Sequence, residues 1–326
     1  MYKRQEQKEL GQNYYENINC GAANAVYAQK WQKWEEGGNS YGFNAGVVRL
    51  DLDSGEETVL IEGRRSSEEQ IGYNPTIAKV SEDGRYVYIW RKPSSGSLSS
   101  DGVPFGAYDT QNNVWIECGT RGDMFSGDVD YEGIYDNTGD FAGPFGLAYR
   151  NGVAPNPKDS SQVAVNAGGD RMMYHNKSIV LADLENNTTA RLSPEGQVTM
   201  TPSFSKDGKS VLYSAAAEID DSLEAYRQNS ANLFEDWFRA PHPIYRVETA
   251  TGRVTQITDS GRFDFLPQEL EDGSILFIRT DGKQFKLMKI KNGRETVLAE
   301  DLGFENEYAQ SGFYGHFKSE RILDIG

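Results

Sequence analysis

The residues best suited to binding a metal lie in an acidic stretch near the middle of the chain. Carboxylates alternate with other residues from 128 to 132 and recur at 136 and 140, and the candidate ligands are Asp128, Asp130, Glu132 and Asp136. Gly133 stands where an EF-hand loop bends, and calcium prefers six or more oxygen ligands. The twelfth position of such a loop holds Gly139 instead of a bidentate glutamate. The stretch therefore predicts either a calcium site or a solvated loop, and calcium is the one cofactor that we consider.

Histidine offers a second set of metal ligands. The chain has three histidines, His175, His242 and His316, which lie far apart and outside any spaced ligand motif. If the fold brought them together they could hold a transition metal, since imidazole is a common ligand. The alternative is three unrelated histidines in turns or on the surface.

A segment from Ala215 to Pro243 carries apolar residues at helical spacing, which predicts a short helical insertion. Its aromatic residues Phe234, Trp237 and Phe238 are candidate partner-binding residues, because an apolar stripe must be covered. Packing of this helix against the rest of the domain is the structural alternative. Trp31 and Trp34 could stack on a sugar, although packing within a sheet is the simpler interpretation.

Catalytic residues are not predicted. No Gly-x-Ser-x-Gly nucleophile elbow occurs in the sequence, and the two cysteines, Cys20 and Cys118, lie outside any Cys-x-x-Cys motif. One disulfide between them stays open. We leave open whether the protein is an enzyme, and favour a protein without catalytic or cofactor-binding residues.

Charge argues against several classes of partner. The chain of 326 residues has 33 basic and 49 acidic residues, a formal net charge of −16, which would repel a phosphate backbone. No apolar run reaches the roughly 18 residues of a membrane span. We therefore expect no nucleic acid partner and no integral membrane segment.

The elements that position these residues are short strands joined by a repeated turn. Ser81-Glu82-Asp83-Gly84 and Ser205-Lys206-Asp207-Gly208 each precede a strongly apolar run, as does Glu271-Asp272-Gly273. Asp-Gly between apolar runs is a strong hairpin signal. A degenerate copy is expected at 162–174, with strands at 162–166 and 172–174 around a Gly168-Gly169-Asp170 turn.

A second hairpin follows each of these, in which a strand ends at an acidic residue and a polar turn leads to another strand. The five copies begin at Val47, Ala107, Ile179, Ile244 and Leu287. Two alternating hairpins that repeat every 40 to 65 residues or so predict four-stranded blades. The fold class is therefore all-β, a β-propeller of about six blades (five to seven) with the helical insertion near 215–243.

The segment from Thr201 to Tyr213 resembles the repeat of TolB-like (PD40, WD40-like) propellers, in which Pro-x-Phe/Trp-Ser-x-Asp-Gly-Lys/Arg precedes an apolar strand. Asn74 to Trp90 is a second match. This resemblance implies a bacterial, extracytoplasmic protein of the periplasm or cell surface that binds a protein or glycan partner and is expected to be a monomer. Related propellers leave two alternatives: a metal-assisted polysaccharide lyase or hydrolase of the oligogalacturonate-lyase type that uses the histidines, and a propeller fragment of a prolyl-oligopeptidase-like peptidase.

The first residues read like the prefix of a translated metagenomic fragment. We therefore expect residues 1–14 to be artefactual or disordered and residues 15–326 to form a single propeller domain, truncated at one or both ends. Phe313 to Ile325 resembles the first two strands of a further blade. A signal peptide or lipid anchor could have preceded residue 6, so the sequence leaves export open.

Overall fold

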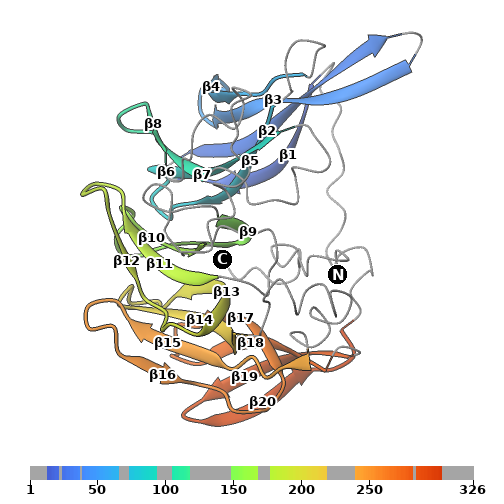
Figure 1. The fold of residues 1–326 in the computed structure, drawn as a ribbon. Coiled ribbons are helices and arrows are strands. Elements are labelled where there is room, and N and C mark those ends of the chain that lie inside the picture. Colours follow the sequence, from blue (N-terminus) through green and yellow to red (C-terminus); the bar gives the residue numbers. More distant parts are fainter. Residues whose placement is uncertain are drawn as a thin grey trace, which may run out of the picture. The chain divides into compact units, whose positions relative to one another are not determined.

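The structure is a computed structural model that describes residues 13–21, 24–36, 39–65, 73–93, 105–117, 148–167, 177–218, 239–281 and 284–302. The regular structure there is almost entirely β-strand. It forms five four-stranded antiparallel sheets, in each of which neighbouring strands follow one another in sequence (Figure 1). The chain divides into two compact units, Met1–Cys118 and Gly119–Gly326.

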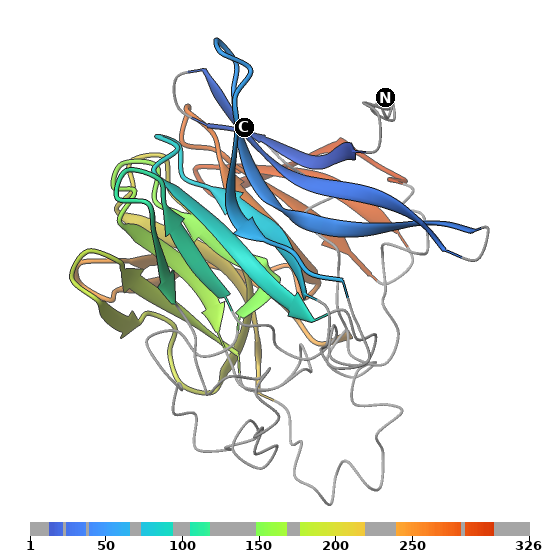
Figure 2. The same ribbon diagram turned by 90° about the horizontal axis from the view of Figure 1, so that it is seen from above.

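The first unit contains two sheets. Sheet A consists of β1 (Asn13–Cys20), β2 (Ala25–Glu36), β3 (Asn39–Asp51) and β4 (Glu57–Glu62). Sheet B consists of β5 (Tyr73–Val80), β6 (Tyr86–Pro93), β7 (Phe105–Asp109) and β8 (Val114–Glu117). The β2–β3 hairpin pairs as far as Glu36 and Asn39, beyond the last pair between β1 and β2, so it extends past its own sheet as a two-stranded ribbon (Figure 2).

The second unit contains three sheets. Sheet C consists of β9 (Ala148–Pro155), β10 (Gln162–Ala167), β11 (Ser178–Asp183) and β12 (Thr188–Arg191). Sheet D consists of β13 (Gln197–Phe204), β14 (Ser210–Ala217), β15 (Ile244–Glu248) and β16 (Val254–Gln256). Sheet E consists of β17 (Phe263–Glu269), β18 (Ile275–Thr280), β19 (Phe285–Lys291) and β20 (Arg294–Ala299).

Consecutive sheets within a unit pack face to face, which explains the continuous apolar runs. Every side chain from Tyr86 to Trp90 on β6 is buried, as expected for a strand covered on both faces. One apolar cluster joins Tyr27 and Val47 of sheet A to Val87 and Ile89 of sheet B. Equivalent clusters lie between sheets C and D and between sheets D and E. Stacked four-stranded meanders are the blades of a β-propeller, and the predicted fold class is confirmed.

The hairpins predicted from Asp-Gly turns are present as β5–β6, β13–β14 and β17–β18, with Gly84, Gly208 and Gly273 at φ values of 70°, 71° and 73°. Only glycine adopts this left-handed conformation at little cost. All five predicted second hairpins are present too, as β3–β4, β7–β8, β11–β12, β15–β16 and β19–β20. The described residues form five sheets, within the predicted range of five to seven blades.

The degenerate repeat was placed wrongly. Residues 162–166 were expected to be a first strand, but they belong to β10, the second strand of sheet C, which pairs with β9 and β11. Gly168 to Asp170 therefore lie in the connection from the second strand to the third. The first turn of sheet C is residues 156–161, where the Asp159 carboxylate accepts hydrogen bonds from the backbone N and Oγ of Ser161. This turn has no Asp-Gly pair, so the sequence pattern missed it.

The expected insertion begins later than Ala215. Ala215 and Ala216 are buried and pair with Thr199 and Val198 as part of β14. The helix expected beyond them falls at 219–238, outside the described residues, as do residues 1–12 and the strands expected at 313–325.

A bulge in the first strand of a sheet connects it to the next sheet. Asn17, Thr201 and Leu266 have φ values of 49°, 48° and 55° at the bulges of β1, β13 and β17. Asn17 Nδ2 donates to the carbonyl of Ile77, 2.8 Å away in sheet B. The Leu266 amide donates to Thr201 Oγ1 at 3.1 Å. These contacts link neighbouring sheets at the bulges, where the regular pairing of the strand is interrupted.

Candidate functional site

The meander gives each sheet two chemically different ends. Its first-to-second and third-to-fourth connections lie at one end, here called the turn end, and contain two to six residues in every sheet. Its second-to-third connection, and the connection to the following sheet, leave from the opposite end, here called the loop end. The long connections, at 63–72, 94–104, 118–147, 168–177 and 218–243, all leave from loop ends.

The sequence candidates belong to these loop-end connections. Asp128, Asp130, Glu132 and Asp136 lie in the connection 118–147, His175 in 168–177, and Phe234, Trp237 and Phe238 in 218–243. All of them, together with His316, lie outside the described residues, so the calcium site, the three-histidine site and the aromatic docking site stay predictions. Within the described ranges, no three His, Cys, Asp or Glu side chains are grouped so that they could hold a metal ion.

Trp31 and His242 are the candidates that the structure describes. Trp31 stacks on Tyr14 of the same sheet with 5.9 Å between ring centroids. His242 has the surroundings of a packing residue. Its side chain is fully buried, and its ring stacks on Phe263 with 3.8 Å between centroids. Nδ1 lies 2.7 Å from the carbonyl oxygen of Ala240, which fits a proton on Nδ1. Burial lowers the pKa of His242 to about 3, despite the opposing hydrogen bond, so the ring is neutral at physiological pH.

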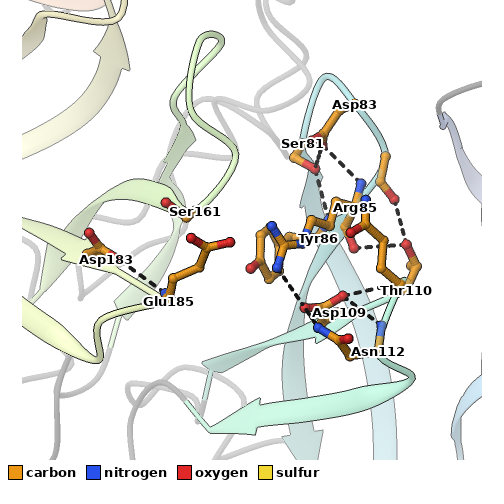
Figure 3. Close-up of polar contacts among 12 residues, drawn as sticks. Ser81, Asp83, Arg85, Tyr86, Asp109, Thr110, Asn112, Ser161, Asp183 and Glu185 are labelled. Atoms are coloured by element: carbon orange, nitrogen blue, oxygen red, sulfur yellow. Dashed lines mark hydrogen bonds and ion pairs between the residues drawn. The ribbon is translucent and has the colours of Figure 1, made fainter.

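The acidic residues of the repeat are structural acceptors at the turn end. In sheet B, the Ser81 hydroxyl donates to Asp83 Oδ1 at 2.7 Å and accepts the Tyr86 amide at 2.9 Å (Figure 3). Ser205 and Asp207 make the same contacts in sheet D. Each Ser-x-Asp-Gly motif thus satisfies backbone groups that the turn leaves unpaired.

The second turn of each sheet uses its acid in a related way. Asp109 accepts the amides of Gln111 and Asn112, the side-chain amide of Asn112 at 2.9 Å, and Arg85 at 3.3 Å (Figure 3). Burial would raise the pKa of this carboxyl, but these donors outweigh it and lower the pKa below its usual value. Hydrogen bonds from Ser54 lower the pKa of Asp51 likewise, so both acids stay ionised.

An open cleft of about 300 Å³ lies between sheets A and B at their turn ends. Sheet A contributes Tyr27, Arg49, Thr58 and Leu60 to its lining. Sheet B contributes residues 83–85 from its first turn and Thr110, Gln111 and Asn113 from its second. The Tyr27 hydroxyl donates to the Gly84 carbonyl at 2.9 Å, so a hydrogen bond between two lining residues links the two sheets. The cleft is therefore a polar recess with hydrogen-bonding side chains on both sides.

Arg49 is the cleft residue that the sequence could have revealed. It interrupts an apolar strand, Val47-Val48-Arg49-Leu50, whose neighbours Val47 and Val48 are fully buried. Its side chain remains 34% exposed and contacts Asp51 at 3.3 Å. The cleft itself had no sequence signal, because its two walls come from different sheets.

A buried ion pair lies in sheet E. Arg279 donates to both carboxylate oxygens of Asp264, with distances of 2.6 and 2.8 Å, and to Glu295. The Asp264 side chain is fully buried. Burial alone would lower the pKa of Arg279, but the two carboxylates outweigh it and raise the pKa, so Arg279 is charged where it bridges β17 and β18.

Two further features are settled for the described part of the chain. Cys20 is an exposed free thiol, and its possible partner Cys118 lies outside the described residues. We also find there no helical segment with the length and apolar character that crossing a membrane requires.

Comparison with known proteins gives similarity at the level of structure. No protein-family model and no curated protein matches the sequence. Similar solved structures include a TolB-type protein from Agrobacterium tumefaciens, at 12% identity and a TM-score of 0.46, covering 88% of this chain and 80% of that one. Oligogalacturonate lyase from Vibrio parahaemolyticus has 11% identity and a TM-score of 0.47, covering 88% of this chain and 65% of that one. Both are TolB-like β-propeller proteins, the type that the sequence repeat resembles.

Proposed function

We propose that this chain is a non-catalytic, extracytoplasmic binding protein that uses the loop ends of its propeller blades to bind a protein or glycan partner. The observation that carries the proposal is the one-sided distribution of long connections. Every turn-end connection contains at most six residues, whereas loop-end connections reach from 118 to 147 and from 218 to 243.

This asymmetry supports binding because the two ends are under different physical demands. The turn-end acids are used by their own turns, as Asp83 and Asp109 are, and a changed residue there would disturb a blade. A long loop-end connection leaves the strand pairing intact whatever its sequence. Binding residues in rigid scaffolds are commonly carried by such loops.

The test pairs a binding assay with a turnover assay on the same samples. The purified chain would be run by affinity electrophoresis through gels that contain single acidic or neutral polysaccharides, and incubated with each of them while new chain ends are counted. One variant replaces residues 219–238 by a short Gly-Ser linker. Its control replaces the turn-end pair Asn292-Gly293 by Asp-Gly, which suits the same turn.

The proposal predicts retardation by at least one polysaccharide without turnover, loss of retardation in the loop variant, and unchanged retardation in the turn control. If no polysaccharide retards the chain, a protein partner is required, and the same pair of variants applies to it. Turnover that disappears in single substitutions of His175 or His316, in variants that remain folded, would refute the proposal and establish the lyase or hydrolase alternative.

A further inference from the structure

Two positions recur at each junction of consecutive sheets within a unit, and between sheets D and E a hydrogen bond joins them. The first lies on the third strand of one sheet, two residues before its turn acid: Arg49 in sheet A, Leu181 in sheet C and Arg246 in sheet D. The second is the last residue of the first strand in the next sheet: Val80, Phe204 and Glu269. The latter three are equivalent because each lies four residues before a turn glycine, whose amide donates to the carbonyl of the residue that follows them.

In two of the three pairs the facing residues match chemically. Arg246 of sheet D donates to Glu269 of sheet E at 2.5 Å. The other carboxylate oxygen of Glu269 accepts the Lys206 amide at 2.8 Å, so this carboxylate is fully used. Between sheets C and D, Leu181 packs against the apolar cluster that contains Phe204.

The pair between sheets A and B does not match. Val80 has no charge to offer Arg49, and it packs half-buried against the apolar cluster of Tyr27 and Val87. Arg49 instead contacts Asp51 of its own strand at 3.3 Å, with both side chains partly exposed. An ion pair this exposed contributes little to stability. Arg49 lines the 300 Å³ cleft. Of the two junctions that have an arginine at this position, the one between sheets A and B lacks the carboxylate that Glu269 supplies between sheets D and E.

We propose that this cleft binds a small carboxylate-bearing ligand, whose carboxylate is held by Arg49 as Glu269 is held by Arg246. A guanidinium binds a carboxylate through two parallel N–H donors, which favours this ligand over a neutral one. Thr58 pairs with Arg49 across the strands, as Thr255 does with Arg246, so the local frame is the same. Gln111 and Asn113 line the opposite wall and can bind neutral parts of the ligand.

The size of the cleft limits the ligand. A volume of about 300 Å³ is at the low end of small-molecule pockets, which suits one monosaccharide or one amino-acid residue. The carboxylate could come from an acidic sugar or from an acidic amino acid. This site is at the turn end, so its occupation does not depend on the loop-end function proposed above.

Isothermal titration calorimetry tests the site with matched pairs of probes. The acidic probes are D-glucuronate and N-acetyl-glutamate methylamide, and their neutral counterparts are D-glucose and N-acetyl-glutamine methylamide. We expect at least one acidic probe to bind with an affinity about tenfold or more above that of its neutral counterpart. The pair that shows the difference identifies the source of the carboxylate.

Three variants locate the binding. Arg49→Gln should weaken the acidic probe about tenfold or more, and Arg49→Lys should weaken it less, because the charge remains without the planar fork. Arg253→Gln is the matched control, since Arg253 is an exposed arginine at the turn end of sheet D. It should bind like the unchanged chain.

Val80→Glu tests the internal comparison directly. The new carboxylate would take the place that Glu269 has between sheets D and E, so Val80→Glu should abolish binding of the acidic probe. In thermal unfolding, adding Arg49→Gln to Val80→Glu should lower the midpoint more than Arg49→Gln does alone. Equal binding by the unchanged chain and Arg49→Gln, or no preference for either acidic probe, would overturn the proposal.

Discussion

Replacing Arg279 by methionine tests how much the buried ion pair between Arg279 and Asp264 contributes to the stability of sheet E. Methionine keeps most of the aliphatic length of arginine and removes the guanidinium. Asp264 would then be a fully buried carboxylate that retains one side-chain donor, the Ser260 hydroxyl at 3.1 Å, and Glu295 would lose its partner.

The expected cost follows from the distances and the burial. Arg279 meets both oxygens of Asp264 at 2.6 and 2.8 Å, which places the charge centres about 4 Å apart and gives about 4 kcal/mol at an effective dielectric constant near 20. Breaking a buried pair on one side typically costs about 3 to 5 kcal/mol. Changing both residues, Asp264→Asn with Arg279→Met, should cost clearly less, because no buried charge remains.

The assay is urea unfolding followed by far-UV circular dichroism, with hydrogen–deuterium exchange of peptides from β17 and β18 as a local measure. We expect faster exchange in both strands for Arg279→Met and partial recovery in the double variant. A loss below about 1 kcal/mol for Arg279→Met would match an exposed pair and refute the reasoning. A double variant less stable than Arg279→Met would refute it as well.

Three other predictions use urea unfolding. Ser81→Ala should lower the free energy of unfolding by about 1 to 2 kcal/mol, because the buried Tyr86 amide loses its acceptor. The control Ser54→Ala, in an exposed turn, should lower it little. Equal losses would contradict the role of Ser81. Gly208→Ala should lower the free energy of unfolding by roughly 3 kcal/mol and Gly252→Ala by roughly 1 kcal/mol. Both glycines have positive φ, but only at Gly208 would the new methyl group clash, 2.3 Å from Asn156 Oδ1. The reverse order would be inconsistent with this packing. Between about pH 6.5 and 3 the unfolded chain binds a proton at His242 that the native chain does not, so the free energy of unfolding should decrease as the pH is lowered, by up to ~1.4 kcal/mol per pH unit. His242→Gln should show a weaker dependence on pH, and an unchanged dependence would exclude a buried neutral ring.

Local signals in the sequence predicted the strands well wherever a turn was encoded by its own residues. The Asp-Gly turns at Gly84, Gly208 and Gly273 were found because glycine and aspartate act on their own backbone, within a few residues. The first turn of sheet C was missed because residues 156–161 form it without that pair. As a result, residues 162–166 were predicted as the first strand of their blade, although they form the second.

The candidate site was predicted less well than the fold. Charge, composition and motif spacing identified possible ligands in the long connections, but they gave no indication of the cleft beside Arg49. A residue such as His242 could be either a ligand or a packing residue from its sequence context, and its burial against Phe263 shows its surroundings only in the folded chain.

The sequence by itself determined the repeat, the hairpins and the all-β class, since each depends on hydrogen bonds between residues close together in the chain. Only the tertiary structure decided which residues meet across neighbouring sheets. Arg246 and Glu269 are 23 residues apart, and Arg49 and Val80 are separated by more, so nothing local distinguishes a filled junction from an open one. Whether an arginine contacts a carboxylate, as Arg246 does, or lines a cleft, as Arg49 does, depends on how two sheets pack, because the two positions come from different sheets.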